Sequence, residues 1–307
     1  FLQWPQWLHK LNLDDVPVAI VNLNYSLIQL GTTLGKGYHC FGSTLNRKRL
    51  RAPVPLRDTR AHCTLVGCIS PNDEIQKRLP QYILTKPKAT TRAERARLAA
   101  LPAPFVWLRA TNGWVSKETL PGILHGIRAA CRAVAGRATQ VVLVWDSASQ
   151  HTQLPVVRSC AARLNLHVLF VPARLTWLVH PLDSHVYSRV KWRYAKEQAR
   201  LRSQDEWFPE DRSVWVPALQ SAVTSRLLCG GHQHAFAANG LLGDTRALKM
   251  VLSDALGADL PLPLLPPSCE DLRKLFGVEK DERFRSLTLF ASLRFWSAFC
   301  RSPSRLI

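Results

Sequence analysis

Apolar and polar residues along the first part of the chain alternate between strand-like runs and polar loops. Apolar, β-branched runs predict strands over residues 18–24, 25–30, 62–70 and 82–85, with a turn between the first two. The segments between the later runs are rich in glycine and basic residues, which is typical of loops and hairpins. We therefore expect the opening strands to pair in an antiparallel arrangement.

From residue 117 onward, the apolar pattern becomes that of helices alternating with buried strands. Apolar residues from Leu120 to Ile127 share one helical face in a segment that opens near Ser116 and ends at Gly136. Two short apolar runs follow, "TQVVLVW" and "LHVLFVP", with a helix-like segment between them. Two buried strands joined through a helix indicate a parallel βαβ unit with a right-handed crossover.

The remainder of the chain reads as helical. A long basic helix is expected over residues 184–203, and helix-like segments follow over 214–228 and 243–256. A proline-rich break at 260–268 precedes an amphipathic, aromatic segment. The order of elements predicts an α/β fold with a mixed sheet flanked by helices, and a helical C-terminal extension.

The net charge of the chain indicates which class of molecule it binds. The 307-residue chain has 41 Lys and Arg residues against 22 Asp and Glu residues, a formal net charge of +19. Such an excess favours a polyanionic partner, with nucleic acid first, over a merely arginine-rich or ribosome-associated protein. No apolar run approaches the roughly 20 residues of a membrane span, so no membrane association is expected. Because the chain opens without Met or a signal-peptide layout, we expect it to be a fragment.

The cysteines carry no metal-binding spacing. None of the eight forms a C-x-x-C pair. Cys63 and Cys68 lie five residues apart with His62 beside them, which leaves a metal pair as the alternative. The same residues fit a strand packed with small thiols, so we favour buried free thiols in a reducing compartment.

Polar residues stand at three predicted strand ends. The first strand ends at Asn22 and Asn24, "VVLVW" is followed by Asp146, and "LHVLFVP" leads through a loop to Asp183. Function gathers at the carboxyl ends of parallel strands, and carboxylates are ligands suited to Mg²⁺ or Mn²⁺. Each aspartate also precedes a helix, where Asp is a favourable cap. Together the residues favour a metal site, with helix capping as the alternative.

Three segments carry a family resemblance. "VVLVWDSASQH", "VPARLTWLVHPLDSHVYSRVKWRY" and "TNGWVSKETL" resemble the DDE superfamily endonuclease domain of pogo- and jerky-type transposases, part of the mariner-related group. That family shows a strand ending in Asp, a short polar stretch and His, matched here by Asp146 and His151. It then shows an apolar strand, Pro and a loop to a second acid, matched by Asp183, with 36 residues (183 − 146 − 1) between the two aspartates.

The resemblance covers about residues 15–245 and leaves 246–307 as a helical extension of unassigned role. It implies an RNase H-like fold with a mixed five-stranded sheet, and a cofactor of Mg²⁺ or Mn²⁺. It also implies DNA as the partner, cleavage and transfer of DNA strands, a nuclear location and a homodimer.

One position departs from the family pattern. Where the family's first strand has a metal-binding Asp, this chain has Asn24, and Tyr25 follows where Glu is usual. His180 replaces the common Gln before the second acid. An amide keeps the size of the carboxylate but loses its charge, so we expect the nuclease activity to be weakened or absent. The alternatives are an active endonuclease with a rearranged site, and a non-catalytic domesticated DNA-binding or interaction protein.

Basic segments fit DNA phosphates. The expected DNA contacts are Arg189, Lys191, Arg193 and Lys196 on the helix 184–203, and Arg47, Lys48 and Arg49 in a basic loop. The alternative is a solvated helix face. Trp192 and Tyr194 of that helix are expected in the core, with base stacking as the alternative.

Overall fold

The structure is a computed structural model, and it describes residues 18–30, 62–86, 96, 99–137, 139–146, 160, 163–164, 166–171, 175–204, 212–242 and 246–257. The described strands are β1 (Val18–Gln29), β2 (His62–Ile69), β3 (Gln81–Thr85), β4 (Phe105–Arg109), β5 (Gln140–Asp146) and β6 (Leu166–Val171). The helices are α3 (Asp73–Gln76), α5 (Leu120–Ala135), α8 (Thr176–Val179), α9 (Tyr187–Ser203), α10 (Arg212–Arg226), α11 (Gln233–Ala238) and α12 (Arg246–Leu256). A π-helical turn, Leu182–Val186, leads directly into α9.

Six strands form one mixed sheet in the order β4-β3-β2-β1-β5-β6. Strand β2 is antiparallel to both of its neighbours, β1 and β3, whereas β5 runs parallel to β1, β6 parallel to β5 and β4 parallel to β3. The expected α/β class, a mixed sheet flanked by helices, is confirmed, with six strands in the described residues rather than five. The strand that the sequence did not predict is β4, a short edge strand whose side chains are mostly half-exposed and whose last residue is charged.

The turn expected within residues 18–30 is absent, because β1 is one strand of 12 residues. Its length follows from its two neighbours. It pairs with β5 over Val18–Leu23 and with β2 over Asn22–Gln29, so each half of the strand has a partner. Asn22 and Asn24 therefore lie in the middle of β1, at the level where β5 ends.

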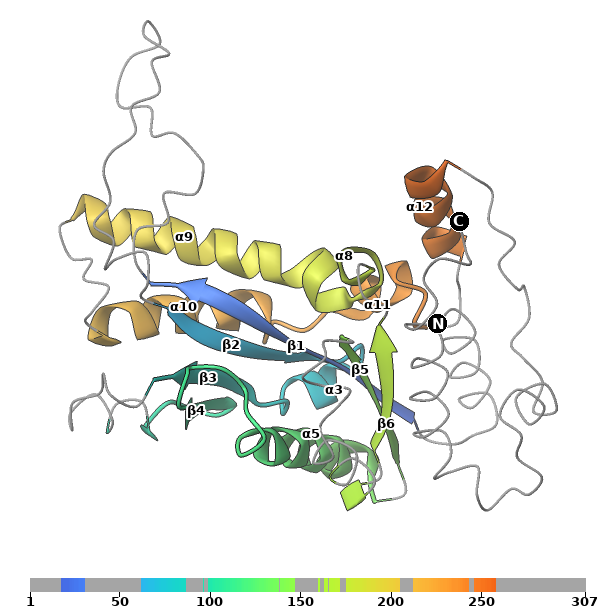
Figure 1. The fold of residues 1–307 in the computed structure, drawn as a ribbon, viewed down its shortest axis with the longest axis horizontal. Coiled ribbons are helices and arrows are strands. Elements are labelled where there is room, and N and C mark those ends of the chain that lie inside the picture. The colour runs from blue at the N-terminus through green and yellow to red at the C-terminus, as the bar shows by residue number, and fades with distance from the viewer. Residues whose placement is uncertain are drawn as a thin grey trace, which may run out of the picture.

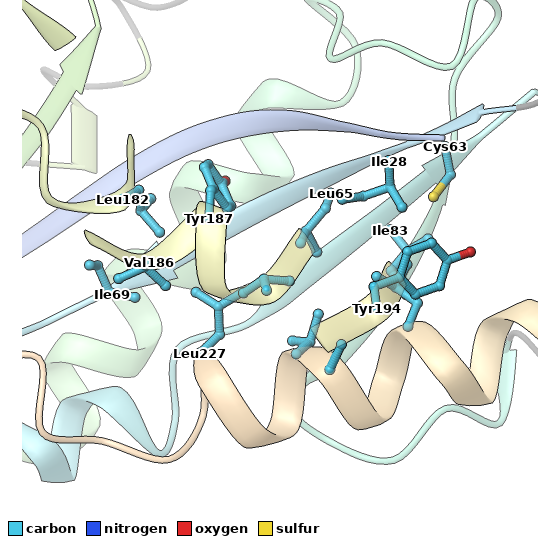
Figure 2. Packing of buried hydrophobic residues seen from close by; sticks show 14 of the residues in the cluster. Ile28, Cys63, Leu65, Ile69, Ile83, Leu182, Val186, Tyr187, Tyr194 and Leu227 are labelled. Carbon is cyan, nitrogen blue, oxygen red and sulfur yellow. The ribbon is translucent and has the colours of Figure 1, made fainter. Parts of the chain in front are cut away.

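Helices cover both faces of the sheet, α9 and α10 on one and α5 on the other (Figure 1). Alternate strand residues feed two separate apolar cores. Ile28, Leu65 and Ile83 pack with α9 and α10, as Figure 2 shows, whereas Val21 and Leu23 pack toward α5. The expected helices over 117–136 and 184–203 correspond to α5 and to α9 with its π-helical turn.

The two cysteines with metal-like spacing do not form a pair. Cys63 belongs to the core under α9, and Cys68 belongs to the core under α5, so they lie on opposite faces of β2. Both are fully buried. This placement agrees with thiols that fill the core rather than bind a metal together. Within the described ranges, no helix is both long and apolar enough to cross a lipid bilayer.

Candidate functional site

Asn24 and Asp146 occupy matching positions on neighbouring parallel strands. Leu23 of β1 pairs with Trp145 of β5, so Asn24 and Asp146 are the next residues along each strand. Neighbouring strands are about 4.8 Å apart, and residues paired across them share a face of the sheet. Because Leu23 and Trp145 point into the core under α5, Asn24 and Asp146 belong to the face that α9 covers.

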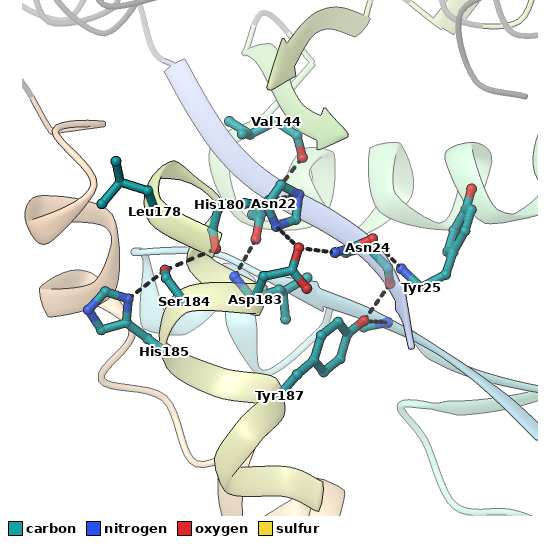
Figure 3. Close-up of polar contacts among 12 residues, drawn as sticks. Asn22, Asn24, Tyr25, Val144, Leu178, His180, Asp183, Ser184, His185 and Tyr187 are labelled. Carbon is teal, nitrogen blue, oxygen red and sulfur yellow. Dashed lines mark hydrogen bonds and ion pairs between the residues drawn. The ribbon is translucent and has the colours of Figure 1, made fainter. Parts of the chain in front are cut away.

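Asp183 reaches the same place from the π-helical turn before α9. The amide nitrogen Nδ2 of Asn24 donates a hydrogen bond of 2.8 Å to Oδ2 of Asp183 (Figure 3). The orientation of the amide is fixed from its other end, because Oδ1 of Asn24 accepts from the backbone N–H of Tyr25 at 2.7 Å. A hydrogen-bond donor therefore faces the Asp183 carboxylate. π-Helical turns of this kind are frequent at functional sites.

A second buried amide holds the chain segment that carries Asp183. Oδ1 of Asn22 accepts from the backbone N–H of Leu182 at 2.9 Å. Its Nδ2 group donates to the carbonyl of Val144 at 3.0 Å and lies 2.9 Å from Nε2 of His180. Asn22 and His180 are fully buried. Asn22 thus ties β1, β5 and the turn before α9 together.

The same contacts assign the tautomer of His180. Both hydrogens of the Asn22 amide point at acceptors, so Nε2 of His180 is the acceptor of its pair. The ring hydrogen of the neutral imidazole then lies on Nδ1, which is 3.6 Å from Oδ2 of Asp183. Two N–H groups, one from Asn24 and one from His180, therefore face the same carboxylate oxygen.

Tyr187 sets the distance between α9 and the sheet. Its hydroxyl accepts from the backbone N–H of Gly67 at 3.0 Å and donates to the carbonyl of Asn24. Asn24 and Gly67 are paired residues of β1 and β2, so the hydroxyl bridges the two strands. A Cβ atom at position 67 would lie 2.8 Å from this hydroxyl, and glycine is what allows the close approach.

The electrostatics of the site reflect two carboxylates in a partly buried setting. Burial raises the pKa of Asp183 to about 6, and the charge of Asp146 adds to the increase. The Lys191 ammonium and the hydrogen bond from Asn24 act in the opposite direction on this pKa. The charge of Asp146 also contributes, after burial, to the raised pKa of Tyr25. Asn24, Asp146 and Asp183 thus form one cluster.

This cluster does not fit a pair of divalent cations. Such cations need anionic or carbonyl oxygens directed at them, and a shared carboxylate between two ions supplies much of the charge. Here the amide of Asn24 directs N–H at Asp183, and Nδ1 of His180 faces the same oxygen. Among the described residues, no group of three or more His, Cys, Asp or Glu side chains is placed to hold a metal ion.

The predicted DNA contacts divide into those described and those outside the described residues. Arg189, Lys191 and Lys196 are exposed on α9, and Arg193 is half-buried. Arg47, Lys48 and Arg49, and likewise His151, lie outside the described residues. The expectation of a core position is right for Tyr194, which is buried, and wrong for Trp192, which is 59% exposed.

Sequence reasoning missed two parts of the site. The Asn22–His180 contact depends on a loop that folds back over β1 from more than 150 residues away, and no local pattern predicts it. The Tyr187–Gly67 contact did carry a signal, because a glycine inside the apolar run "HCTLVGCI" indicates that another group approaches the strand closely.

Comparison with known proteins adds a family. The DDE superfamily endonuclease family matches residues 60–217, a range that contains Asp146 and Asp183 but not Asn24. Among solved structures, the chain is similar to the Mos1 transposase in a paired-end complex with the left transposon end. The identity is 15% and the TM-score 0.36, over 79% of this chain and 63% of that chain. The chain thus spans less than two thirds of the length of that transposase chain. No curated protein matches the sequence.

Proposed function

The chain belongs to the DDE superfamily endonuclease family, and we propose that it is a transposon-derived DNA-binding domain whose strand cleavage is weak or absent. The proposal places the domain at residues 15–245, assigns it to the pogo- and jerky-type branch and locates it in the nucleus. Residues 246–307 are proposed to be an extension outside the endonuclease domain. The homodimer implied by the family resemblance is retained as part of this proposal.

The observation that carries the proposal is the 2.8 Å hydrogen bond from Asn24 to Asp183. Endonuclease domains of this family generally use divalent metal ions. A metal-binding carboxylate at position 24 would add a negative charge and direct an oxygen toward the site. The amide supplies neither, and it directs a hydrogen-bond donor at Oδ2 of Asp183.

The geometry also explains why one substitution is informative. An Asp at position 24 in the same orientation would place its oxygen about 2.8 Å from the Asp183 oxygen. Two carboxylate oxygens at that distance repel each other unless a proton or a cation lies between them. Asn24→Asp therefore changes a hydrogen-bonded pair into a pair that needs a shared proton or a bound cation.

DNA binding is supported by charge and by its location. The net charge of +19 suits a polyanion. Arg189, Lys191 and Lys196 are exposed on the helix that follows Asp183. Lys191 is near enough to Asp183 to lower the pKa of its carboxyl group, so the basic surface of α9 extends to the carboxylate cluster.

The test is a nicking assay on supercoiled plasmid DNA with Mg²⁺ or Mn²⁺, using the 307-residue chain. We expect the natural chain to nick no faster than Asp146→Ala, and Asn24→Asp to nick faster than both. Asn24→Gln is the matched control, because it keeps an amide and should remain inactive. Robust cleavage by the natural chain that Asp146→Ala abolishes would overturn the proposed loss of activity and favour an active, rearranged site.

A further inference from the structure

The outer face of α9 combines basic groups with an exposed tryptophan. The exposed residues described on α9 are Ser188, Arg189, Lys191, Trp192, Ala195, Lys196, Ala199, Arg200 and Ser203. Trp192 is 59% exposed, although an indole ring is among the side chains most favourably buried. An exposed indole ring among cations can bind a ligand that offers both a flat ring and negative charge.

The opposite side of the helix prevents Trp192 from turning inward. Val190, Tyr194 and Gln198 are buried against the rest of the domain, and they fix the rotation of α9 about its axis. The Tyr187 hydroxyl fixes the start of the helix on the sheet. Trp192 therefore stays on the solvent side as part of the rigid fold.

The surroundings of the ring leave room for a flat ligand. The ammonium of Lys196 lies 5.6 Å from the centroid of the Trp192 ring, a cation–π contact that holds the ring in place. The exposed neighbours one helical turn and two turns further on are Ala195 and Ala199, whose short side chains do not cover it. The acidic Glu197 is paired with Arg200 at 2.7 Å, so its charge is largely compensated.

These features suit a ligand in which flat rings alternate with negatively charged groups. Nucleobases supply the ring and phosphates supply the charge, but in a duplex the faces of the bases are stacked on one another and are not accessible. An unpaired base can stack on an exposed aromatic side chain. Arg189 and Lys196 are seven residues apart, about 10 Å along the helix axis, and Trp192 lies between them.

We propose that the outer face of α9 binds single-stranded DNA, with Trp192 stacking on an unpaired base. Arg189, Lys191 and Lys196 contact the phosphates on either side of that base. The inference rests on the proposed DNA-binding function and adds to it the strandedness of the DNA. In this proposal, Trp192 makes the chain prefer unpaired DNA. The basic residues bind the phosphates of single-stranded and double-stranded DNA alike.

The chain offers a matched control. Trp177 of α8 is 60% exposed, as much as Trp192, but α8 contains no charged residue. Loss of an exposed indole has the same effect on general surface stickiness at both positions. Trp192 lies among exposed basic residues of α9, whereas the described residues of α8 include no basic side chain.

The experiment measures the fluorescence anisotropy of a labelled oligonucleotide of about 20 nucleotides, single-stranded or as a duplex of the same sequence. The natural 307-residue chain is compared with Trp192→Ala, Trp192→Phe and Trp177→Ala. We expect Trp192→Ala to weaken single-strand binding about tenfold or more, because stacking of one base on an aromatic side chain is of that size. Trp192→Phe should retain most of the affinity, and duplex binding by Trp192→Ala should change by less than about twofold.

Four results would overturn the inference, and they differ in what they say about the proposed function. Unchanged single-strand binding by Trp192→Ala removes the stacking role and leaves DNA binding intact. Equal losses for Trp192→Ala and Trp177→Ala show non-specific stickiness. Absence of salt-sensitive binding to either DNA form removes the proposed function as well. A fourth result, loss of self-association in Trp192→Ala with DNA affinity unchanged, assigns the face to a protein contact and also overturns the inference.

Discussion

The two faces of the sheet are covered by helices of similar length, but the side chains buried beneath those helices differ in kind. Helix α5 packs against its face with Leu120, Ile123, Leu124 and Ile127, an ordinary apolar contact. The face under α8 and α9 also has an apolar core, but at the level of Asn24 it includes buried amides, a buried imidazole and a carboxylate with raised pKa. Burying such groups is costly unless each is hydrogen-bonded.

The difference separates a face packed mainly with apolar side chains from a face that holds the polar cluster of Asn24, Asp146 and Asp183. The contacts of α5 with the sheet are mainly apolar, and the buried Arg128 on α5 is hydrogen-bonded to the backbone carbonyls of Thr139 and Arg137. On the α9 face, Asn22 uses every hydrogen-bonding group of its amide to hold the segment that carries Asp183. A network that is complete in this way fixes one position for Asp183, and the predictions below separate its effects from those of ordinary packing.

The largest effect is expected from truncation on the α5 face. Leu124→Ala removes a fully buried side chain and should lower the free energy of unfolding by about 2 to 5 kcal/mol. Chemical denaturation measures the change. Because α5 lies across the sheet from the site, DNA affinity measured where the variant is still folded should be unchanged. A loss of affinity in the folded variant would contradict the division between the two faces.

The next effect tests the close approach of α9. Gly67→Ala places a methyl group 2.8 Å from the Tyr187 hydroxyl and should cost about 1 to 3 kcal/mol of folding free energy. In a double-mutant cycle, Gly67→Ala with Tyr187→Phe should cost less than the sum of the single changes, because the clashing oxygen is gone. Additive costs would show that Tyr187 does not set the position of α9.

A smaller, pH-dependent effect is expected at Asp183. Its folded pKa of about 6 lies above the ordinary value of 3.8, so the folded state holds the proton more tightly and loses stability as pH rises through that window. Asp183→Asn removes this penalty and should raise the free energy of unfolding above pH 6 by about 1 to 2 kcal/mol, allowing for partial exposure. Near pH 4 the gain should vanish. A gain independent of pH would contradict the assigned pKa.

The smallest effect concerns the two N–H groups that face Asp183. Asn24→Asp should give a folded chain that Mn²⁺ stabilises, by about 1.4 kcal/mol when the ion is present at ten times its Kd. At the same Mn²⁺ concentration, Asn24→Asp combined with His180→Gln should be stabilised further, because glutamine can still accept from Asn22 and the imidazole N–H is gone. Thermal unfolding with and without Mn²⁺ measures both. Equal stabilisation of the single and double variants would exclude a role for His180.

Much of the arrangement could be predicted from the sequence because it follows from local patterns. The apolar runs before Asp146 and Asp183 predicted two parallel strands, and the carboxyl ends of such strands meet at one edge of a sheet. The length of β1 could not be predicted, since it depends on β2 and β5 pairing with different halves of the strand. The edge strand β4 was missed because its alternation is weak and its side chains are mostly half-exposed.

The polar network of the site was less predictable than its position. Asn24 was recognised as a departure from a family pattern, but its donation to Asp183 required the relative placement of β1 and the turn before α9. Trp192 illustrates the opposite case. The residues around Trp192 predicted a helix but did not show which side of it faces the core. Val190 and Tyr194 decide this, because they are buried beneath the helix.

The most direct test is to titrate the chain with Mn²⁺ near pH 7.5 and to measure the binding by isothermal titration calorimetry. If the amide of Asn24 has replaced a metal-binding carboxylate, the natural chain should bind Mn²⁺ no more tightly than Asp183→Ala, and Asn24→Asp should bind it measurably more tightly. Tight binding of two Mn²⁺ ions by the natural chain, lost in both Asp146→Ala and Asp183→Ala, would contradict the account.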